Sequence, residues 1–264
     1  MSAIFRALWA YRGFILGSVK RKFQSKYRNS LLGAAWNVIN PLAMILVYTV
    51  IFWQVMRAKL PGVDSTFAYS IYLCSGVLTW GVFSEIIDRA QNTFLENANL
   101  LKKMSFPRLS LPVIVVANAL LNFAIIFGLF TGFLIVTGNF PGLVYLALVP
   151  VLAVMVVFAI GLGVTLGVLN VFFRDVGKFF GIFLQFWFWL TPIVYPANIL
   201  PDSIAELLAY NPMAPIAYAC QSILVNQQLP QWDSLWPVIL LAVLMCGLGL
   251  RLFRRRAGEM VDEL

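Results

Sequence analysis

The sequence has 264 residues, of which 61% are hydrophobic and 11% are charged, with 19 basic residues, 11 acidic residues and no histidine. Soluble domains are about half apolar and about a quarter charged, so this composition excludes a soluble protein and indicates an integral membrane protein. Histidine-based metal sites and acid–base sites are excluded as well. The apolar runs are continuous rather than alternating, which predicts an all-α fold of membrane-spanning helices instead of a β-barrel.

Residues 1–30 are expected to form a cytoplasmic amphipathic and basic segment. Four apolar residues fall on one face of a helix: Ile4, Leu8, Tyr11 and Ile15. A basic cluster at 20–28 follows this face, whereas in a secretory signal peptide the basic residues come first. We therefore expect a helix that lies on the inner leaflet, where membrane lipid with anionic headgroups attracts the cluster. A frayed tail is the alternative.

Residues 31–250 are expected to form a membrane domain with six spans. Charges divide the chain into apolar runs, and a turn cluster at 137–142 divides the longest run into two, because one crossing needs only about 20 residues. The resulting spans are 29–56, 65–84, two within 109–173, 179–195 and 234–250. The uncharged stretch at 207–232 is not counted as a span, because its apolar part is short and prolines interrupt it.

Basic residues lie almost entirely on one side of this path. With six spans, all but two of the 19 lysines and arginines are cytoplasmic, the exceptions being Arg57 and Lys59. The positive-inside rule then places both termini in the cytoplasm, with a cytoplasmic tail at 251–264. The net charge of +8 is explained by this topology, so nucleic acid is not expected as a partner.

The stretch at 196–230, between the fifth and sixth spans, is rich in proline and is expected on the outer side. Ser203 and Glu206 have the spacing of a capping box and predict a short helix at 203–210, and a second short helix is expected at 215–225. Two short, partly apolar helices predict an external re-entrant hairpin, which survives at membrane depth only where protein or a wet cavity surrounds it. A simple surface loop is the alternative.

No ionisable residue is expected near the centre of a span, which argues against an ion-coupled or proton-coupled carrier. Glu85, Asp88 and Arg89 are placed at the inner end of the second span, where one helical turn separates them and an ion-pair anchor is expected. The other acidic residues are scattered or lie in the tail, so neither a catalytic constellation nor a metal site is predicted. A membrane-embedded enzyme and a scaffold without transport activity are the alternatives from other classes.

Four motifs occur in register with these spans: LGAAW at 32–36 with Pro41, NANLLKKMSFPR at 97–108, FFRDV at 172–176 and NPM at 211–213. Over nearly the whole chain they resemble the permease subunits of type-2 ABC exporters, and most of all those that export O-antigen, capsular polysaccharide or teichoic acid. The resemblance implies a homodimer with two ABC ATPase subunits beneath it, which moves a lipid-linked polysaccharide from the cytoplasm across the bacterial inner membrane. It also implies that ATP and Mg²⁺ bind to the ATPase subunits, while this chain is not an enzyme and binds no cofactor. A drug or a lipid is the alternative substrate.

The segment at 97–106, between the second and third spans, corresponds in this resemblance to a cytoplasmic coupling helix. Asn97 or Asn99 is expected to cap it, and Pro107 to end it. Its large apolar side chains are too exposed to belong to a core, so they need a groove on the ATPase, with basic residues at the rim. The expected docking residues are Asn97, Asn99, Leu100, Leu101, Lys102, Lys103, Met104, Phe106 and Arg108, with Arg174 and Asp175 of the second cytoplasmic loop. An interfacial helix on lipid is the alternative.

Aromatic rings near the outer ends of the first and fifth spans are expected to line a conduit at the dimer axis. A polymer must pass many identical sugars without binding any of them tightly, and rings offer shallow contacts to the C–H faces of sugars. The expected conduit residues are Tyr48, Phe52, Trp187 and Tyr195.

Overall fold

The computed structural model describes residues 9–25, 35–51, 67–103, 109–196, 201, 206 and 208–263. This part of the chain contains helices and no strand, as predicted for an all-α protein. Within it, four helices are long and apolar enough to cross a membrane: α4 (Ala68–Glu96), α6 (Ser110–Val136), η3 with α7 (Gly142–Phe172), and η5 with α11 (Trp232–Arg256). The chain is therefore an all-helical protein with several candidate membrane spans.

Three shorter apolar helices accompany them: α3 (Trp36–Val50), α8 (Asp175–Trp189) and α10 (Met213–Leu224). α3 and α8 have 15 residues each and overlap the predicted first and fifth spans. Each is about 22 Å long, which is shorter than a hydrocarbon core of about 30 Å. α10 has 12 residues and coincides with the second helix of the predicted hairpin. Half of the first helix of that hairpin, residues 203–205 and 207, lies outside the described residues.

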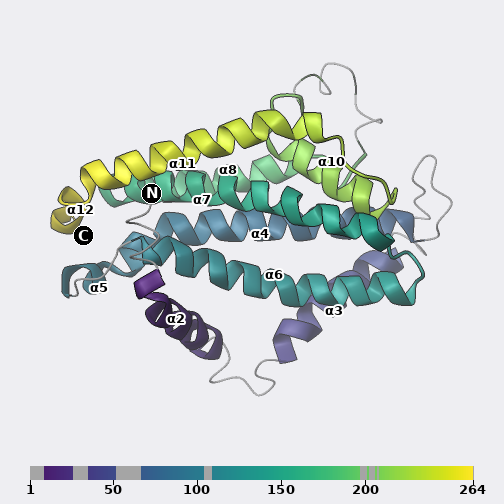
Figure 1. Cartoon of the computed structure of the whole chain (residues 1–264), viewed down its shortest axis with the longest axis horizontal. Helices are drawn as coiled ribbons and strands as arrows, with labels where there is room; N and C mark the ends of the chain where they lie inside the picture. The colour runs from purple at the N-terminus through teal and green to yellow at the C-terminus, as the bar shows by residue number, and fades with distance from the viewer. Residues whose placement is uncertain are drawn as a thin grey trace.

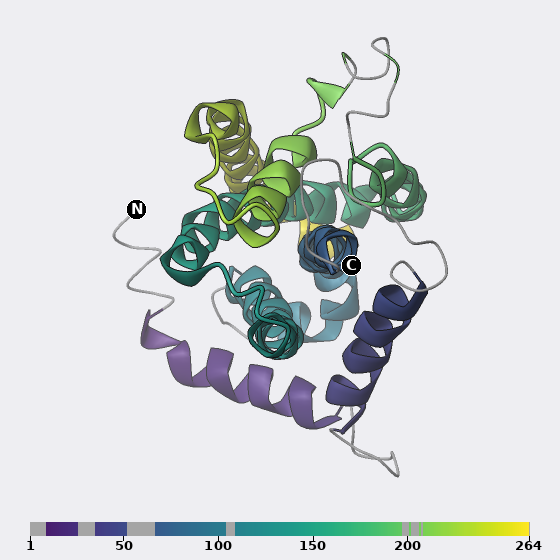
Figure 2. The same ribbon diagram turned by 90° about the vertical axis from the view of Figure 1, so that its right-hand side faces the viewer.

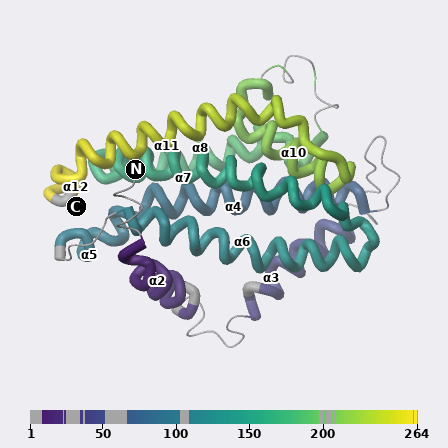
Figure 3. The backbone as a smooth tube through the Cα atoms, in the orientation of Figure 1, coloured from purple at the N-terminus to yellow at the C-terminus, as the bar shows by residue number. Residues whose placement is uncertain are grey.

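The long helices lie side by side along the longest axis of the molecule, with α4, α7 and α11 running in one direction and α6 in the other (Figure 1). The turn between α6 and α7 lies at one end together with α10, and we call this the α10 end. The opposite end carries the short helix α5 (Ala98–Lys103), the turn between α7 and α8, and the C-terminal helix α12 (Glu259–Glu263), and we call this the α5 end (Figure 3). The helix α2 (Arg12–Ser25) packs on α6 and runs across the long helices rather than along them (Figure 2).

Helix α4 is central to the bundle and packs against α6, α7, α8 and α10. Its Phe83 side chain is fully buried, with 0% exposed. Glycines let α7 (Leu148–Phe172) approach both α4 and α11 (Trp236–Arg256). A Cβ on Gly163 would lie 2.6 Å from the Ala90 Cβ of α4. A Cβ on Gly161 would lie 2.6 Å from the backbone nitrogen of Cys246 in α11. Small residues at such crossings let membrane helices pack closely, so α4, α7 and α11 form one tight block.

Two helices continue beyond their predicted ends. α11 runs to Arg256 instead of ending at 250, and α4 runs to Glu96 instead of ending at 84. The charges at 85–89 do not stop α4, because Glu85 and Arg89 pair on the same helix with 2.8 Å between their side chains. Glu85 also accepts a hydrogen bond from Asn122, which lies at the middle of the candidate span α6. Glu85 therefore lies well inside α4 and not at the end of that helix.

The N-terminal helix differs in extent from the predicted one. α2 continues through the first residues of the basic cluster, at 20–22, and ends at Ser25. Its buried residue is Val19, which is 7% exposed. Of the predicted apolar face, Tyr11 is exposed and Ile15 is half-buried, whereas Ile4 and Leu8 lie outside the described residues. Val19 lies one helical turn after Ile15, so it continues the predicted apolar face, and the helix packs on α6.

Candidate functional site

Helix α5 follows α4 with a single residue, Asn97, between them. The Asn97 carbonyl accepts hydrogen bonds from the N–H groups of Leu100 and Leu101, both at 3.0 Å, and so begins α5. The side-chain amide of Asn97 donates to the Thr93 carbonyl of α4 at 2.7 Å. The backbone of Asn97 thus starts α5 while its side chain holds the end of α4. Asn99, the other predicted cap, lies inside α5 and is exposed.

Leu101 is buried, with 6% of its surface exposed, in an apolar cluster that we call the α5-end cluster. The other buried members are Phe94, Leu111, Val168, Val171, Phe253 and Met260. The prediction that Leu101 is too exposed to be a core residue is therefore wrong. It treated 251–264 as a separate tail, whereas the extension of α11 and helix α12 bring Phe253 and Met260 against α5. Leu100 is half-buried against the same cluster.

The surface that is left at the α5 end combines exposed side chains from two segments. Asn99 and Lys102 are exposed on α5. Phe173, Arg174 and Asp175 are exposed at the turn between α7 and α8, and the Phe173 side chain is 67% exposed. Aromatic and arginine side chains contribute much of the binding energy of protein interfaces, so this turn is suited to hold a partner protein.

Phe173 is a candidate docking residue that the sequence predictions omitted. The signal was present, because Phe172 and Phe173 are consecutive at the end of a helix, where neighbouring side chains point in different directions. Phe172 does so and packs against the α5-end cluster. Of the predicted docking residues, Met104, Phe106, Arg108 and the side chain of Lys103 lie outside the described part of the chain.

The turn is fastened to the bundle by the buried side chain of Asn170, which is 2% exposed. Its amide nitrogen donates to the Gln91 carbonyl of α4 at 3.0 Å, and its amide oxygen accepts from the Gly177 N–H of α8 at 2.9 Å. One side chain of α7 therefore links α4 and α8 directly behind Phe173, Arg174 and Asp175.

At the α10 end, hydrogen bonds from side chains satisfy the non-helical backbone at 190–196. The Tyr72 hydroxyl lies 3.1 Å from the Pro192 carbonyl and 2.9 Å from the Tyr195 carbonyl, and Gln221 of α10 donates to the Pro192 carbonyl at 2.9 Å. Helix α10 itself is largely buried against α4 and α7. Irregular backbone of this kind is stable at membrane depth because protein surrounds and satisfies it.

The four predicted conduit residues fall in different environments. Trp187 is 8% exposed, packs edge-on against Trp80 with ring centroids 5.9 Å apart, and donates from its Nε1 to the Asn211 side chain at 2.8 Å. Its ring is enclosed within the single subunit, so its position does not support a conduit role. Tyr48 and Tyr195 are half-buried, and Phe52 lies outside the described residues. Other α8 rings are exposed, at 70% for Phe179, 65% for Phe186 and 62% for Trp189.

A helical bundle with several candidate membrane spans is typical of a multi-pass membrane protein. The chain belongs to the ABC-2 type transporter family, whose model matches residues 15–227. This family confirms the resemblance to type-2 ABC exporter permeases that the four motifs indicated.

Several characterised proteins are similar to most of the chain. The O-antigen export system permease protein RfbA of Myxococcus xanthus is 29% identical over 266 residues, which cover 100% of both chains. The protein of the same name from Klebsiella pneumoniae is 29% identical over 231 residues, which cover 87% of this chain and 86% of the relative. The polysialic acid transport protein KpsM of Escherichia coli is 20% identical over 247 residues, which cover 92% of this chain and 93% of the relative.

Proposed function

We propose that the chain is the channel-forming membrane subunit of an ATP-driven exporter, which moves a lipid-linked polysaccharide of the O-antigen type out of the cytoplasm across the inner membrane. The observation that carries the proposal is the similarity to the Myxococcus xanthus O-antigen permease, at 29% identity over the full length of both chains. ATP binding and hydrolysis belong to a separate nucleotide-binding subunit, and this chain binds no cofactor.

The proposed topology has six crossings, with the α5 end in the cytoplasm and the α10 end outside. The four long helices supply four crossings, and α3 and α8, continued by their flanking residues, supply the other two. Lys102, Arg174 and the arginines at 254–256 all belong to segments of the α5 end, which agrees with the positive-inside rule. Both termini are then cytoplasmic, and α10 is a re-entrant helix on the outer side.

The proposed docking site for the ATPase is the exposed surface of α5 together with the turn between α7 and α8. Phe173 enters an apolar groove of the ATPase, and Lys102 and Arg174 pair with acidic groups at its rim. The buried bonds of Asn170 to α4 and α8 pass the movement of the docked subunit into the bundle. In a homodimer, two such surfaces hold two ATPase subunits.

The proposed conduit lies between the two permease subunits and is lined by Tyr48, Phe52 and Tyr195. Trp187 is left out of the lining because its ring is enclosed by Trp80 and its neighbours. It supports α8 from within the subunit, while exposed α8 rings such as Phe186 face the partner or the polymer. Aromatic contacts to sugars are shallow, so the polymer can slide past them.

The experiment is deletion of the gene, followed by complementation with the intact chain. We expect deletion to remove surface polysaccharide and to leave the lipid-linked polymer inside the cell, and complementation to reverse both changes. Purification of the tagged permease should also recover an ATPase subunit. If deletion leaves surface polysaccharide unchanged while an ATPase still co-purifies, the substrate is a drug or a lipid. If no ATPase co-purifies, the transport function itself is wrong.

A further inference from the structure

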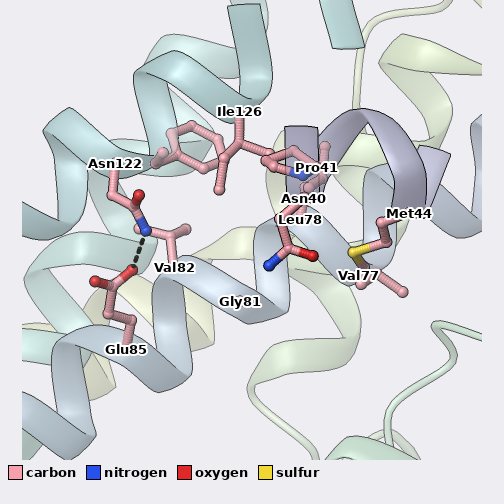
Figure 4. Close-up of a pocket in the computed structure, with 11 residues that line it drawn as sticks. Asn40, Pro41, Met44, Val77, Leu78, Gly81, Val82, Glu85, Asn122 and Ile126 are labelled. Atoms are coloured by element: carbon pink, nitrogen blue, oxygen red, sulfur yellow. Dashed lines mark hydrogen bonds between the residues drawn. The ribbon is translucent and has the colours of Figure 1, made fainter. Parts of the chain in front are cut away.

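A cavity of about 260 Å³ opens between α3, α4 and α6, outside the docking surface and outside the proposed conduit. Figure 4 shows Glu85 of α4 and Asn122 of α6 at one end of it, and Asn40 of α3 beside Gly81 of α4. The remaining lining is apolar and includes Pro41 and Phe123. Three helices thus bring a carboxylate and two amides to one otherwise apolar hollow.

Two of the polar groups of this cavity, Glu85 and Asn122, lie in the middle part of their helices. Asn122 is at the middle of α6, and its side-chain nitrogen donates to the Glu85 carboxylate at 3.1 Å, so the carboxylate lies at the same depth. Ionisable side chains at the centre of membrane bundles are costly and line substrate or ion pathways far more often than they face lipid. The depth of Glu85 therefore indicates that this hollow meets a polar ligand or water.

The charge of Glu85 is already balanced. One of its carboxylate oxygens lies 2.8 Å from the Arg89 guanidinium, while the other accepts the bond from Asn122. The Asn122 amide oxygen and the Asn40 amide have no hydrogen-bond partner among the described residues. A ligand here therefore needs to be uncharged and able both to donate and to accept hydrogen bonds, which is the chemistry of hydroxyl groups.

The apolar part of the lining restricts the ligand further. Phe123 and Pro41 offer surfaces that suit the C–H faces of a sugar ring. Ligand pockets usually measure about 300–1,000 Å³, so a cavity of this size holds one ring and not a length of polymer. A lipid acyl chain would leave the Asn40 amide and the Asn122 amide oxygen without partners in a non-aqueous setting, which is unfavourable.

From these observations we infer that the α3–α4–α6 cavity is a subsite for one neutral sugar residue of the exported polymer. The inference rests on the proposed function, because the sugar is the one that the permease carries. The amides of Asn40 and Asn122 bind hydroxyl groups, and the Glu85–Arg89 pair keeps the site neutral.

Gly81 provides a direct probe of this site, because a Cβ added there would meet no atom within 4 Å. In the purified permease–ATPase complex, with Cys246→Ala to remove the half-buried native thiol, Gly81→Cys should react with a water-soluble maleimide. The probes are the lipid-linked polymer from cells that lack the permease and the same polymer after acid release from its lipid. Both should slow the labelling of Gly81→Cys. Gly128→Cys on α6, also without neighbours within 4 Å, is the control and should not be protected.

Each outcome of the labelling experiment decides the inference. Protection by both forms of the polymer supports a sugar site. Protection by the lipid-linked form alone would assign the cavity to the lipid carrier and overturn the inference. The absence of protection by either form would also overturn it. If Gly81→Cys does not react at all, the cavity is not reached by water and the inference is also wrong.

Two further variants test the site in cells. Gly81→Leu fills the cavity, and Asn40→Leu removes an amide that bonds to no described side chain, so neither change breaks a described contact. Both should lower surface polysaccharide by about threefold to tenfold at matched protein level, as expected when one hydrogen bond to the ligand is lost or the room for the ligand is filled. The ATPase should still bind. Gly128→Leu should export normally. If the parent chain exports polymer and all three variants export equally, the sugar subsite is wrong while the proposed function stands.

Discussion

The backbone N–H of Gly177 donates a hydrogen bond of 2.9 Å to the side-chain oxygen of Asn170, across the turn that joins α7 to α8. The two residues are in close contact, since a Cβ on Gly177 would lie 2.7 Å from the Asn170 amide nitrogen. Residue 177 is therefore a glycine because no larger side chain fits beside Asn170, and not because its backbone conformation requires one. Because Asn170 also bonds to α4, the exposed turn and the centre of the bundle share one buried side chain.

We expect Gly177→Ala to weaken this junction. The added methyl group must push Asn170 away from the Gln91 carbonyl or from the N–H of residue 177, and the loss of a buried hydrogen bond costs about 1–3 kcal/mol. Thermal unfolding of the purified permease should start at a lower temperature, and export should fall. Gly181→Ala, on the same helix but with no neighbour within 4 Å, is the matched control and should leave both unchanged. Identical melting of the two variants would refute a structural role for the Asn170–Gly177 contact.

Leu101 and Phe173 should respond in opposite ways to truncation. Leu101→Ala leaves a cavity in the α5-end cluster and should lower the free energy of unfolding by about 2–5 kcal/mol. Phe173→Ala removes an exposed ring, so the free energy of unfolding should change by no more than about 0.5 kcal/mol while the ATPase is lost during purification. Thermal unfolding and co-purification measure the two effects separately. A Phe173→Ala permease that keeps its ATPase would show that the turn is not the docking surface.

Reversal of the charge at Lys102 should weaken binding of the ATPase without unfolding the permease. Lys102 is exposed on α5, so Lys102→Glu costs little stability, but it replaces attraction by repulsion at an acidic rim. The amount of ATPase recovered with the permease should fall, and the fall should be larger at low salt because salt screens exposed charges. Lys102→Arg keeps the charge and should bind normally. The docking model fails here if the Glu and Arg variants recover equal amounts of ATPase.

Asn211 is expected to be a stability hot spot of the α10 end. Its side-chain oxygen accepts from the Trp187 indole at 2.8 Å and from the Met213 N–H at 3.0 Å. Asn211→Ala leaves both donors without this partner, at a cost of about 1–3 kcal/mol for each buried group, and should lower the melting temperature. Gln228→Ala, which truncates an exposed side chain at the same end, should melt like the parent. If Asn211→Ala melts at the same temperature as the parent, water replaces the Asn211 oxygen and the hot spot is wrong.

The helical architecture was predictable from the sequence, because the apolar runs are long and a turn cluster separates α6 from α7. The place of α10 was also predictable, since prolines and polar residues limit its length. The end of α4 was not predictable. A charge ends an apolar run, but it does not end a helix where Glu85 pairs with Arg89 one turn later.

The environment of single side chains was less predictable, because it depends on elements distant in the sequence. Leu101 is buried by Phe253 and Met260, which come from the C-terminal helices. Trp187 is enclosed because Trp80 and Asn211 meet it from two different segments. No periodicity in α5 or α8 contains that information. The exposed Phe173 was within reach of sequence reasoning, since consecutive side chains on a helix point in different directions and α7 ends at this position.

The unbroken length of α4 constrains how the two ends of the subunit can move. The helix has 29 residues and is about 43 Å long, with Tyr72 near one end, Glu85 in its middle and Phe94 near the other end. A hydrogen-bonded helix of this kind is stiff, so its two ends move together. If docking of a partner tilts the Phe94 end, the Tyr72 end moves as well. An inner opening and an outer opening that depend on α4 are then coupled and do not vary independently.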